Sequence, residues 1–142
     1  MLLNGCPIIW SSKLMHQVAL SAMMAECYAL SAAMKEVLPL LEVAKVVARA
    51  LGIDENVITD FRTTIWEDNM GCLILAQHEP GHNTTRSKFY DVRVHWFRQI
   101  LSQEGSLMSV EKIASEDQLS DILTKITKPD TFRHLRAELM GW

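Results

Sequence analysis

At 142 residues, with 49% hydrophobic and 22% charged side chains, the chain is long enough to bury a core and is not composed like a disordered segment. Its formal net charge of -3 excludes a generally basic nucleic-acid-binding protein, so contact with nucleic acid would require a local basic patch. The three cysteines, Cys6, Cys27 and Cys72, form no C-x-x-C pair. Their number and spacing argue against a disulfide framework or a thiolate zinc site and favour a reducing compartment.

Neither a signal peptide nor a membrane span is expected. The first ten residues lack the charged start and the long apolar stretch of a signal peptide. The most apolar stretch, residues 37–53, is interrupted by Glu42, Lys45 and Arg49.

Taken in chain order, the hydrophobic periodicity predicts strands and helices that alternate as in an α/β domain. A strand is expected at 6–12. A helix follows from about Leu20 to Leu51, which Pro39 should kink and Gly52 should end. The later elements are a strand at 61–67, a helix at 69–78, a polar loop at 79–87, a helix at 88–103, a strand at 106–114, a helix at 116–126 capped by Ser115 and Gln118, and a helix at 132–139.

Three carboxylates stand out, each with a structural alternative. Glu26 lies in the middle of a predicted apolar stripe, where it either binds something or extends to solvent. The small and apolar residues expected on its face are Ala19, Ala22, Met23, Ala29, Leu30, Ala33 and Val37. Asp68 follows the strand at 61–67, where α/β proteins place ligands, although Asp68 or Asn69 also suits a helix N-cap. Taken alone, Asp121 is better explained by a solvated salt bridge to Lys125 than by a functional role.

Five blocks in order make the chain resemble the ribonuclease H domain of copia-type retrotransposon polyproteins. The blocks are "PIIWSSK", "VALSAMMAECYAL", "WEDNMGCLILA", "RSKFYDVRVHWFRQ" and "DQLSDILTK". The family patterns are P-I-S-W-x-S-K, V-A-L-S-S-x-E-A-E-Y-x-A-L, C-D-N-x-x-A-I, R-T-K-H-I-D-I-R-x-H-F-I-R and D-Q-L-A-D-I-L-T-K. The ending "FRHLRAELMGW" is similar to the family's F-x-x-L-R-x-x-L-G.

The resemblance implies a ribonuclease H-like mixed sheet flanked by helices, in a single domain over residues 1–142. It also implies that the RNA strand of an RNA–DNA hybrid is cut by two-metal hydrolysis with Mg²⁺, or with Mn²⁺ in its place. Glu26, Asp68 and Asp121 match three of the family's four catalytic and metal-binding carboxylates. Glu67 matches none of them and is expected to be an exposed acid at the end of a strand.

The family's first aspartate lies on the central strand of its sheet, upstream of "PIIW", and no residue of this chain matches it. We therefore expect a domain that is incomplete at the N-terminus, less stable, and inactive on its own. Whether the chain is an enzyme is left open. The alternative is a non-catalytic retroelement remnant that is at most a weak nucleic-acid or protein-binding module.

The partners that the resemblance implies are the hybrid and the rest of the reverse transcriptase polyprotein. The implied location is intracellular, in a cytoplasmic retroelement particle, with nuclear access left open. A basic cluster is the expected hybrid contact, with Arg93 and Arg98 favoured for phosphate; the alternative is a solvated basic face. Its members are Arg86, Lys88, Arg93, His95 and Arg98.

Overall fold

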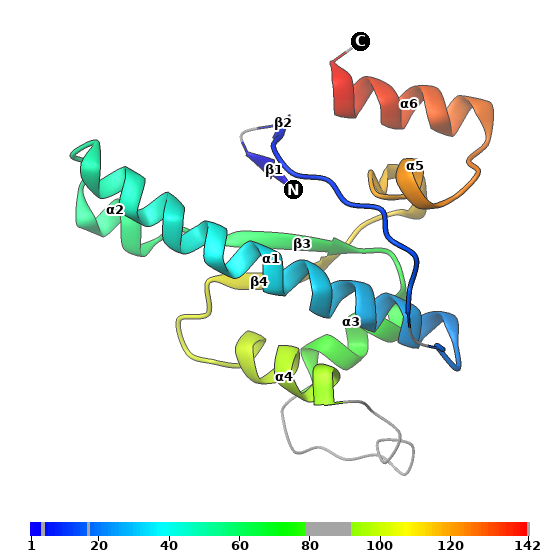
Figure 1. Cartoon of the computed structure of the whole chain (residues 1–142), viewed down its shortest axis with the longest axis horizontal. Coiled ribbons are helices and arrows are strands. Elements are labelled where there is room, and N and C mark those ends of the chain that lie inside the picture. The colour runs from blue at the N-terminus through cyan, green and yellow to red at the C-terminus, as the bar shows by residue number, and fades with distance from the viewer. Residues whose placement is uncertain (4, 17, 79–91, 142) are drawn as a thin grey trace.

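The computed structural model describes residues 1–3, 5–16, 18–78 and 92–141. It is a mixed α/β arrangement in which two small sheets are flanked by helices (Figure 1). In chain order the elements are β1 (Leu2–Leu3), β2 (Cys6–Pro7), α1 (Ala22–Ala50), α2 (Glu55–Thr59), β3 (Thr63–Glu67), α3 (Met70–Gln77), α4 (Val92–Leu101), β4 (Met108–Lys112), a 3₁₀ turn (Ser115–Asp117), α5 (Asp121–Thr124) and α6 (Pro129–Met140).

The long helix α1 begins and ends where local chemistry requires. The Ser21 side chain accepts a hydrogen bond from the backbone N–H of Met24 at 3.2 Å, which satisfies an N–H that the helix itself cannot pair. Gly52 adopts a φ of +73° just beyond the last turn, a conformation that costs glycine little. Pro39 lies inside the helix and does not end it.

Strands β3 and β4 form the parallel pair on which the helices pack. Their register runs from Thr63 opposite Met108 to Glu67 opposite Lys112. The chain between them contains α3 and α4, as a parallel connection requires. Along β3 the side chains alternate, so that Thr64 and Trp66 are exposed while Glu67 is buried.

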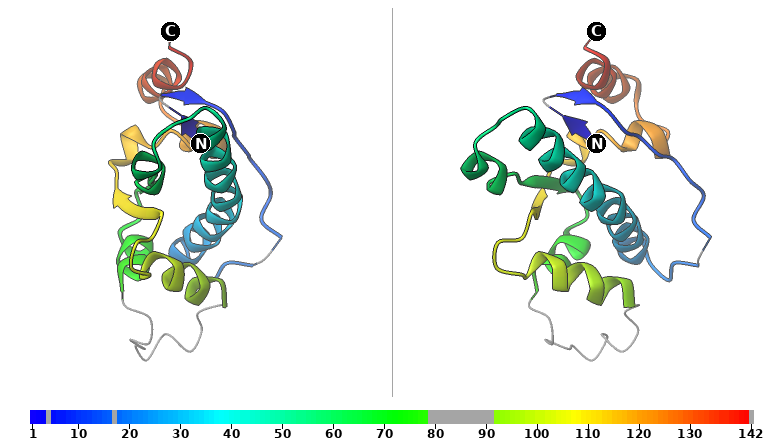
Figure 2. Two further views of the ribbon diagram at one scale, coloured as in Figure 1. Left: turned by 90° about the vertical axis from the view of Figure 1, so that its left-hand side faces the viewer. Right: turned by 60° about the vertical axis from the view of Figure 1, so that its left-hand side comes forward.

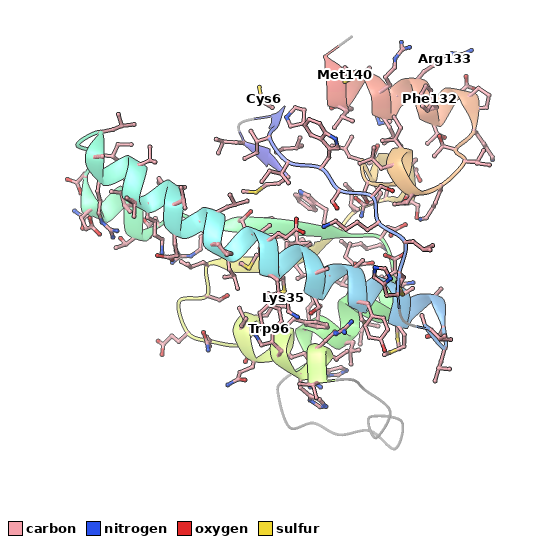
Figure 3. The ribbon with its side chains drawn as sticks, viewed as in Figure 1. Cys6, Lys35, Trp96, Phe132, Arg133 and Met140 are labelled. Carbon is pink, nitrogen blue, oxygen red and sulfur yellow. The ribbon has the colours of Figure 1, made fainter. Side chains whose placement is uncertain are left out.

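The buried core lies between α1, α3, α4 and β4. Figure 2 shows α1 and β4 on opposite sides of the molecule, with α3 and α4 closing one end between them. Lys35 of α1 adds a polar contact at the margin, with its Nζ 5.3 Å from the centroid of the Trp96 ring on α4 (Figure 3). The core side chains are Cys27, Leu30, Met34, Leu41, Cys72, Leu73, Leu75, Ala76, Val94, Phe97, Met108 and Val110.

The predicted strand at 6–12 is largely wrong. Only Cys6 and Pro7 are in a strand, paired antiparallel with β1. A strand persists only where a neighbour accepts its backbone hydrogen bonds, and β1 itself is two residues long. The single mixed sheet that the resemblance implies is accordingly replaced by two separate two-stranded sheets.

The predicted helix at 116–126 is also wrong in detail, because its capping box does not form. The Ser115 side chain caps nothing, and the Gln118 Nε2 donates to the backbone carbonyl of Trp66 at 3.0 Å instead. A 3₁₀ turn and the four-residue α5 result. The sequence reasoning also missed α2, which Asp54 caps through the N–H of Asn56.

The strand at 61–67 and the helix at 69–78 are confirmed within two residues by β3 and α3, and β4 confirms the strand at 106–114. Helix α6 confirms the last predicted helix and extends it. The predicted loop at 79–87 and the first turn of the helix at 88–103 lie outside the described residues.

Phe97 is fully buried in the core, whereas 44% of Phe132 is exposed on α6. We expect Phe97→Ala to lower the free energy of unfolding by about 3–5 kcal/mol, because it removes contacts and leaves a cavity. Phe132→Ala is the matched control and should cost less than half as much. Urea denaturation followed by circular dichroism measures both, and equal losses would contradict this description of the core.

Candidate functional site

The three carboxylates selected from the sequence come from three different elements. Glu26 lies near the start of α1, Asp68 directly follows β3, and Asp121 is the first residue of α5. Lys125, at the end of α5, connects two of them: its Nζ lies 2.8 Å from Asp121 Oδ1 and 4.0 Å from Asp68 Oδ2. The structure therefore brings Asp68 and Asp121 together around one ammonium group.

Glu26 belongs to the same cluster. Burial raises the pKa of its carboxyl group, the charge of Lys125 lowers it, and the charges of Asp68 and Asp121 raise it again. Glu26 is thus within electrostatic range of these three charges, while the direct contacts in this group are those of Lys125 with Asp68 and Asp121. We call Glu26, Asp68, Asp121 and Lys125 the carboxylate cluster.

The cluster is partly removed from water. The side chains of Asp68 and Asp121 are only 14% and 13% exposed, whereas that of Lys125 is 50% exposed. Hydrogen bonding to Asp121 raises the pKa of Lys125, so the ammonium form is favoured. A cation is thus held against nearly buried acids, and it offsets the cost of placing them together.

The buried stripe of α1 differs from the predicted one. Of the residues expected on the buried face with Glu26, Leu30 is buried and Met23 and Val37 pack against the core, whereas Ala22, Ala29 and Ala33 are exposed. Cys27 and Met34, which were not expected there, are buried. Larger side chains gain more free energy from leaving water than alanine does, so they take the interior. Glu26 consequently lies beside the stripe rather than in its middle, half-buried instead of enclosed.

Two roles were left open at the strand end, a helix N-cap and a site ligand, and the structure settles the first of them. Asn69 Oδ1 accepts the N–H of Cys72 at 3.1 Å and caps α3. Asp68 is thereby left to face Lys125. The prediction that Asn69 caps while Asp68 serves the site is confirmed for the cap; the role of Asp68 in a reaction stays a prediction.

Glu67 corrects the sequence reasoning. It is 6% exposed instead of being an exposed acid, and its Oε1 accepts the N–H of Asn69 at 2.9 Å. Burial raises the pKa of its carboxyl group. The burial of Glu67 could have been predicted from the sequence. Alternation along a strand puts Glu67 on the same face as Ile65, which packs against the core.

The basic cluster is divided by the structure. Arg86 and Lys88 lie outside the described residues. Arg93 is half-buried, with its Cζ 5.3 Å from the centroid of the Tyr28 ring, and His95 is exposed. Arg98 is 1% exposed and donates from Nε to the carbonyl of His78. An arginine enclosed in the core cannot reach a phosphate, so the expectation for Arg98 is corrected.

The donor chemistry of the carboxylate cluster suits a hard cation such as Mg²⁺. Its arrangement does not: among the described residues, no group of three or more histidine, cysteine, aspartate or glutamate side chains is arranged to hold a metal ion. The Lys125 ammonium bridges Asp68 and Asp121, where a bound cation would be repelled by it. The described residues also include no helix long and apolar enough to cross a membrane.

Fold and cluster together define a small α/β unit with an acidic site at the end of a parallel strand. The chain is 31% identical over 138 residues to the "Retrovirus-related Pol polyprotein from transposon TNT 1-94" of Nicotiana tabacum. The match covers 97% of this chain and 9% of that polyprotein. No family model and no solved structure matches. The likeness supports a retroelement-derived protein that corresponds to part of a Pol polyprotein.

The raised pKa of Glu26 predicts a pH-dependent stability. The folded chain binds the Glu26 proton more tightly than the unfolded chain does, so ionising Glu26 lowers the free energy of unfolding. This loss of stability is complete above the folded pKa and absent below the ordinary value of 4.5. We expect Glu26→Gln to be more stable than the natural chain at pH 7, with the difference vanishing as the pH falls to about 4. Urea titrations at a series of pH values measure this.

Lys125→Met should raise the pKa of Glu26 further, because it removes the charge that lowers this pKa. Lys128→Met is the control, since Lys128 is exposed and is not among the causes of the Glu26 shift. Carbon-13 NMR titration of the glutamate carboxyl groups separates the two variants. A Glu26 pKa unaffected by Lys125→Met would contradict the cluster.

Proposed function

We propose that the chain is a ribonuclease H-type segment of a retrotransposon Pol polyprotein, and that its carboxylates belong to a site acting on the RNA strand of an RNA–DNA hybrid. The observation that carries the proposal is the approach of Asp68 and Asp121, from two elements, to Lys125, with Glu26 on a third element within range of their charges. These are the residues that the family resemblance selects. The likeness to a Pol polyprotein supports the same assignment.

In this proposal Glu26, Asp68 and Asp121 would hold Mg²⁺, or Mn²⁺ in its place, only in an arrangement other than the one described above, in which no group of three acids among the described residues is placed to hold an ion. There the ion would supply activation of water and stabilisation of the leaving oxygen. The chain's own contribution is electrostatic: the acids are oriented by β3, α1 and α5, and their partial burial strengthens their attraction for a cation. Lys125 competes for the same carboxylates and must withdraw from Asp68 and Asp121 before an ion can approach them.

A second candidate function is supported by that competition. A chain in which Lys125 permanently neutralises the acids is a non-catalytic retroelement remnant, with at most weak binding of nucleic acid or protein. The two candidates differ in whether the carboxylates take part in cleavage. In the first case the remainder of a Pol polyprotein would be the covalent partner of this segment.

We expect the 142-residue chain alone not to cleave an RNA–DNA hybrid, with Mg²⁺ or with Mn²⁺. Only three of the four carboxylates that the resemblance assigns have a match here, and small displacements at a catalytic centre can cost about 10²-fold. A chain extended upstream to include the aspartate-bearing strand should cleave, and Asp68→Asn should abolish that cleavage. Gel analysis of a labelled hybrid is the measurement.

Two outcomes distinguish the candidates. Activity confined to the extended chain, and lost with Asp68→Asn, would support the enzyme. An inactive extended chain that retains its fold by circular dichroism would support the remnant. Robust cleavage by the short chain, lost in Asp68→Asn, would show that the fourth carboxylate is unnecessary.

Hybrid binding should depend on Arg93 and His95, the described members of the basic cluster outside the core. We expect Arg93→Gln to weaken hybrid affinity several-fold and to reduce the salt dependence of binding by about one unit of slope, because one phosphate contact is lost. Arg93→Lys should retain most of both. Arg133→Gln removes a charge that already pairs with Asp130 on α6, and it should have no effect. Fluorescence anisotropy at several salt concentrations tests this; equal effects of Arg93→Gln and Arg133→Gln would contradict it.

A further inference from the structure

Two of the three cysteines meet in the core although they are far apart in sequence. Cys27 on α1 and Cys72 on α3 are 45 residues apart, and their Sγ atoms lie 3.5 Å from each other. Both are free thiols and both are fully buried. Cys6, on β2, is exposed.

We propose that Cys27 and Cys72 are a redox-active pair that forms a reversible disulfide between α1 and α3. A disulfide needs its sulfur atoms at about 2.05 Å, so each thiol must move by less than 1 Å towards the other from the present separation. Both helices already pack in the same core, so the two sulfur atoms are held near each other in the folded chain. This proposal does not depend on ribonuclease H activity.

Either thiol can begin the reaction, because the two sulfur atoms face each other at 3.5 Å within the same core. The thiolate is the reactive nucleophile, so one of the two thiols must lose its proton first, and the other then acts as the resolving thiol.

A small hydroperoxide such as hydrogen peroxide can serve as the oxidant. The thiolate of one cysteine attacks one peroxide oxygen, the O–O bond breaks, and hydroxide leaves, giving a sulfenic acid on that cysteine. The thiol of the other cysteine then attacks that sulfur, the S–O bond breaks, and the departing oxygen takes the thiol proton and leaves as water. In total two thiols and one hydrogen peroxide yield one disulfide and two waters.

The disulfide would act next to the carboxylate cluster. Cys27 directly follows Glu26, and the N–H of Cys72 is bound by Asn69, the residue after Asp68. A covalent link between α1 and α3 would thus restrict the motion of Cys27, next to Glu26, relative to the start of α3, next to Asp68. Neither cysteine belongs to the family patterns quoted above, which have Tyr and Ala at these places, so the pair is a feature of this chain.

The test uses the full chain with Cys6→Ser, which removes the exposed thiol and leaves the core untouched. Treatment of the folded protein with stoichiometric hydrogen peroxide should lower the intact mass by about 2 Da, the loss of two hydrogen atoms. Peptide mapping should find Cys27 joined to Cys72. The thermal midpoint should rise by roughly 10 °C, because the closed loop restricts the unfolded chain, and dithiothreitol should reverse the change.

Two controls make the result decisive. Cys6→Ser/Cys72→Ala should gain oxygen at Cys27 instead of losing hydrogen, because the resolving thiol is absent. The chain with all three cysteines, oxidised in urea, should show pairings that include Cys6, which the folded chain should not. Oxidised folded protein that still titrates two free thiols, or that links only between molecules, would overturn the proposal.

Discussion

The burial of one stripe of α1 determines most of what surrounds the candidate site. Cys27, Leu30, Met34 and Leu41 follow helical spacing, and they are the side chains that α1 contributes to the core shared with α3, α4 and β4. Once this stripe is buried, the direction of every other side chain on α1 is fixed at about 100° per residue. Glu26 precedes Cys27 and is therefore turned to the border of the core, half-buried, where it can approach Asp68 and Asp121. The position of Glu26 is therefore set by the buried apolar side chains of α1.

Placing three acids at that border has an electrostatic cost, and Lys125 offsets it. Like charges near one another in a partly desolvated place disfavour ionisation, which is why Asp68 and Asp121 raise the pKa of Glu26. The Lys125 ammonium opposes this effect while held by Asp121 one helical turn away. A divalent cation would neutralise the same acids with more charge, but it would first have to displace the lysine. Lys125 and any added cation would thus compete for the same carboxylates.

How much could be predicted from the sequence depended on the range of the interaction involved. Local signals succeeded: β3, α3 and β4 follow from periodicity, and Asn69 caps α3 as its type and place suggested. Predictions that needed distant partners failed. The strand at 6–12 found no neighbour to continue it, and Gln118 bonded to Trp66 instead of completing a capping box. The Asp121–Lys125 pair was expected as a solvated bridge, but its extension to Asp68 required knowing that α5 lies beside the end of β3. The Cys27–Cys72 contact had no sequence signal, because it depends on how α1 meets α3.

Three successive residues at the end of β3 show how one short stretch serves packing, folding and the candidate site together. Glu67 continues the inward face of the strand, and its carboxylate accepts the N–H of Asn69. Asn69 in turn accepts the N–H of Cys72 and starts α3. These two bonds fix the backbone on both sides of Asp68, so its side chain is held toward Lys125 without having to cap the helix itself. Burial raises the pKa of Glu67, and the charges of Glu26 and Asp68 raise it too. Replacing Glu67 would therefore act on Asp68 both through the backbone of the turn and through charge.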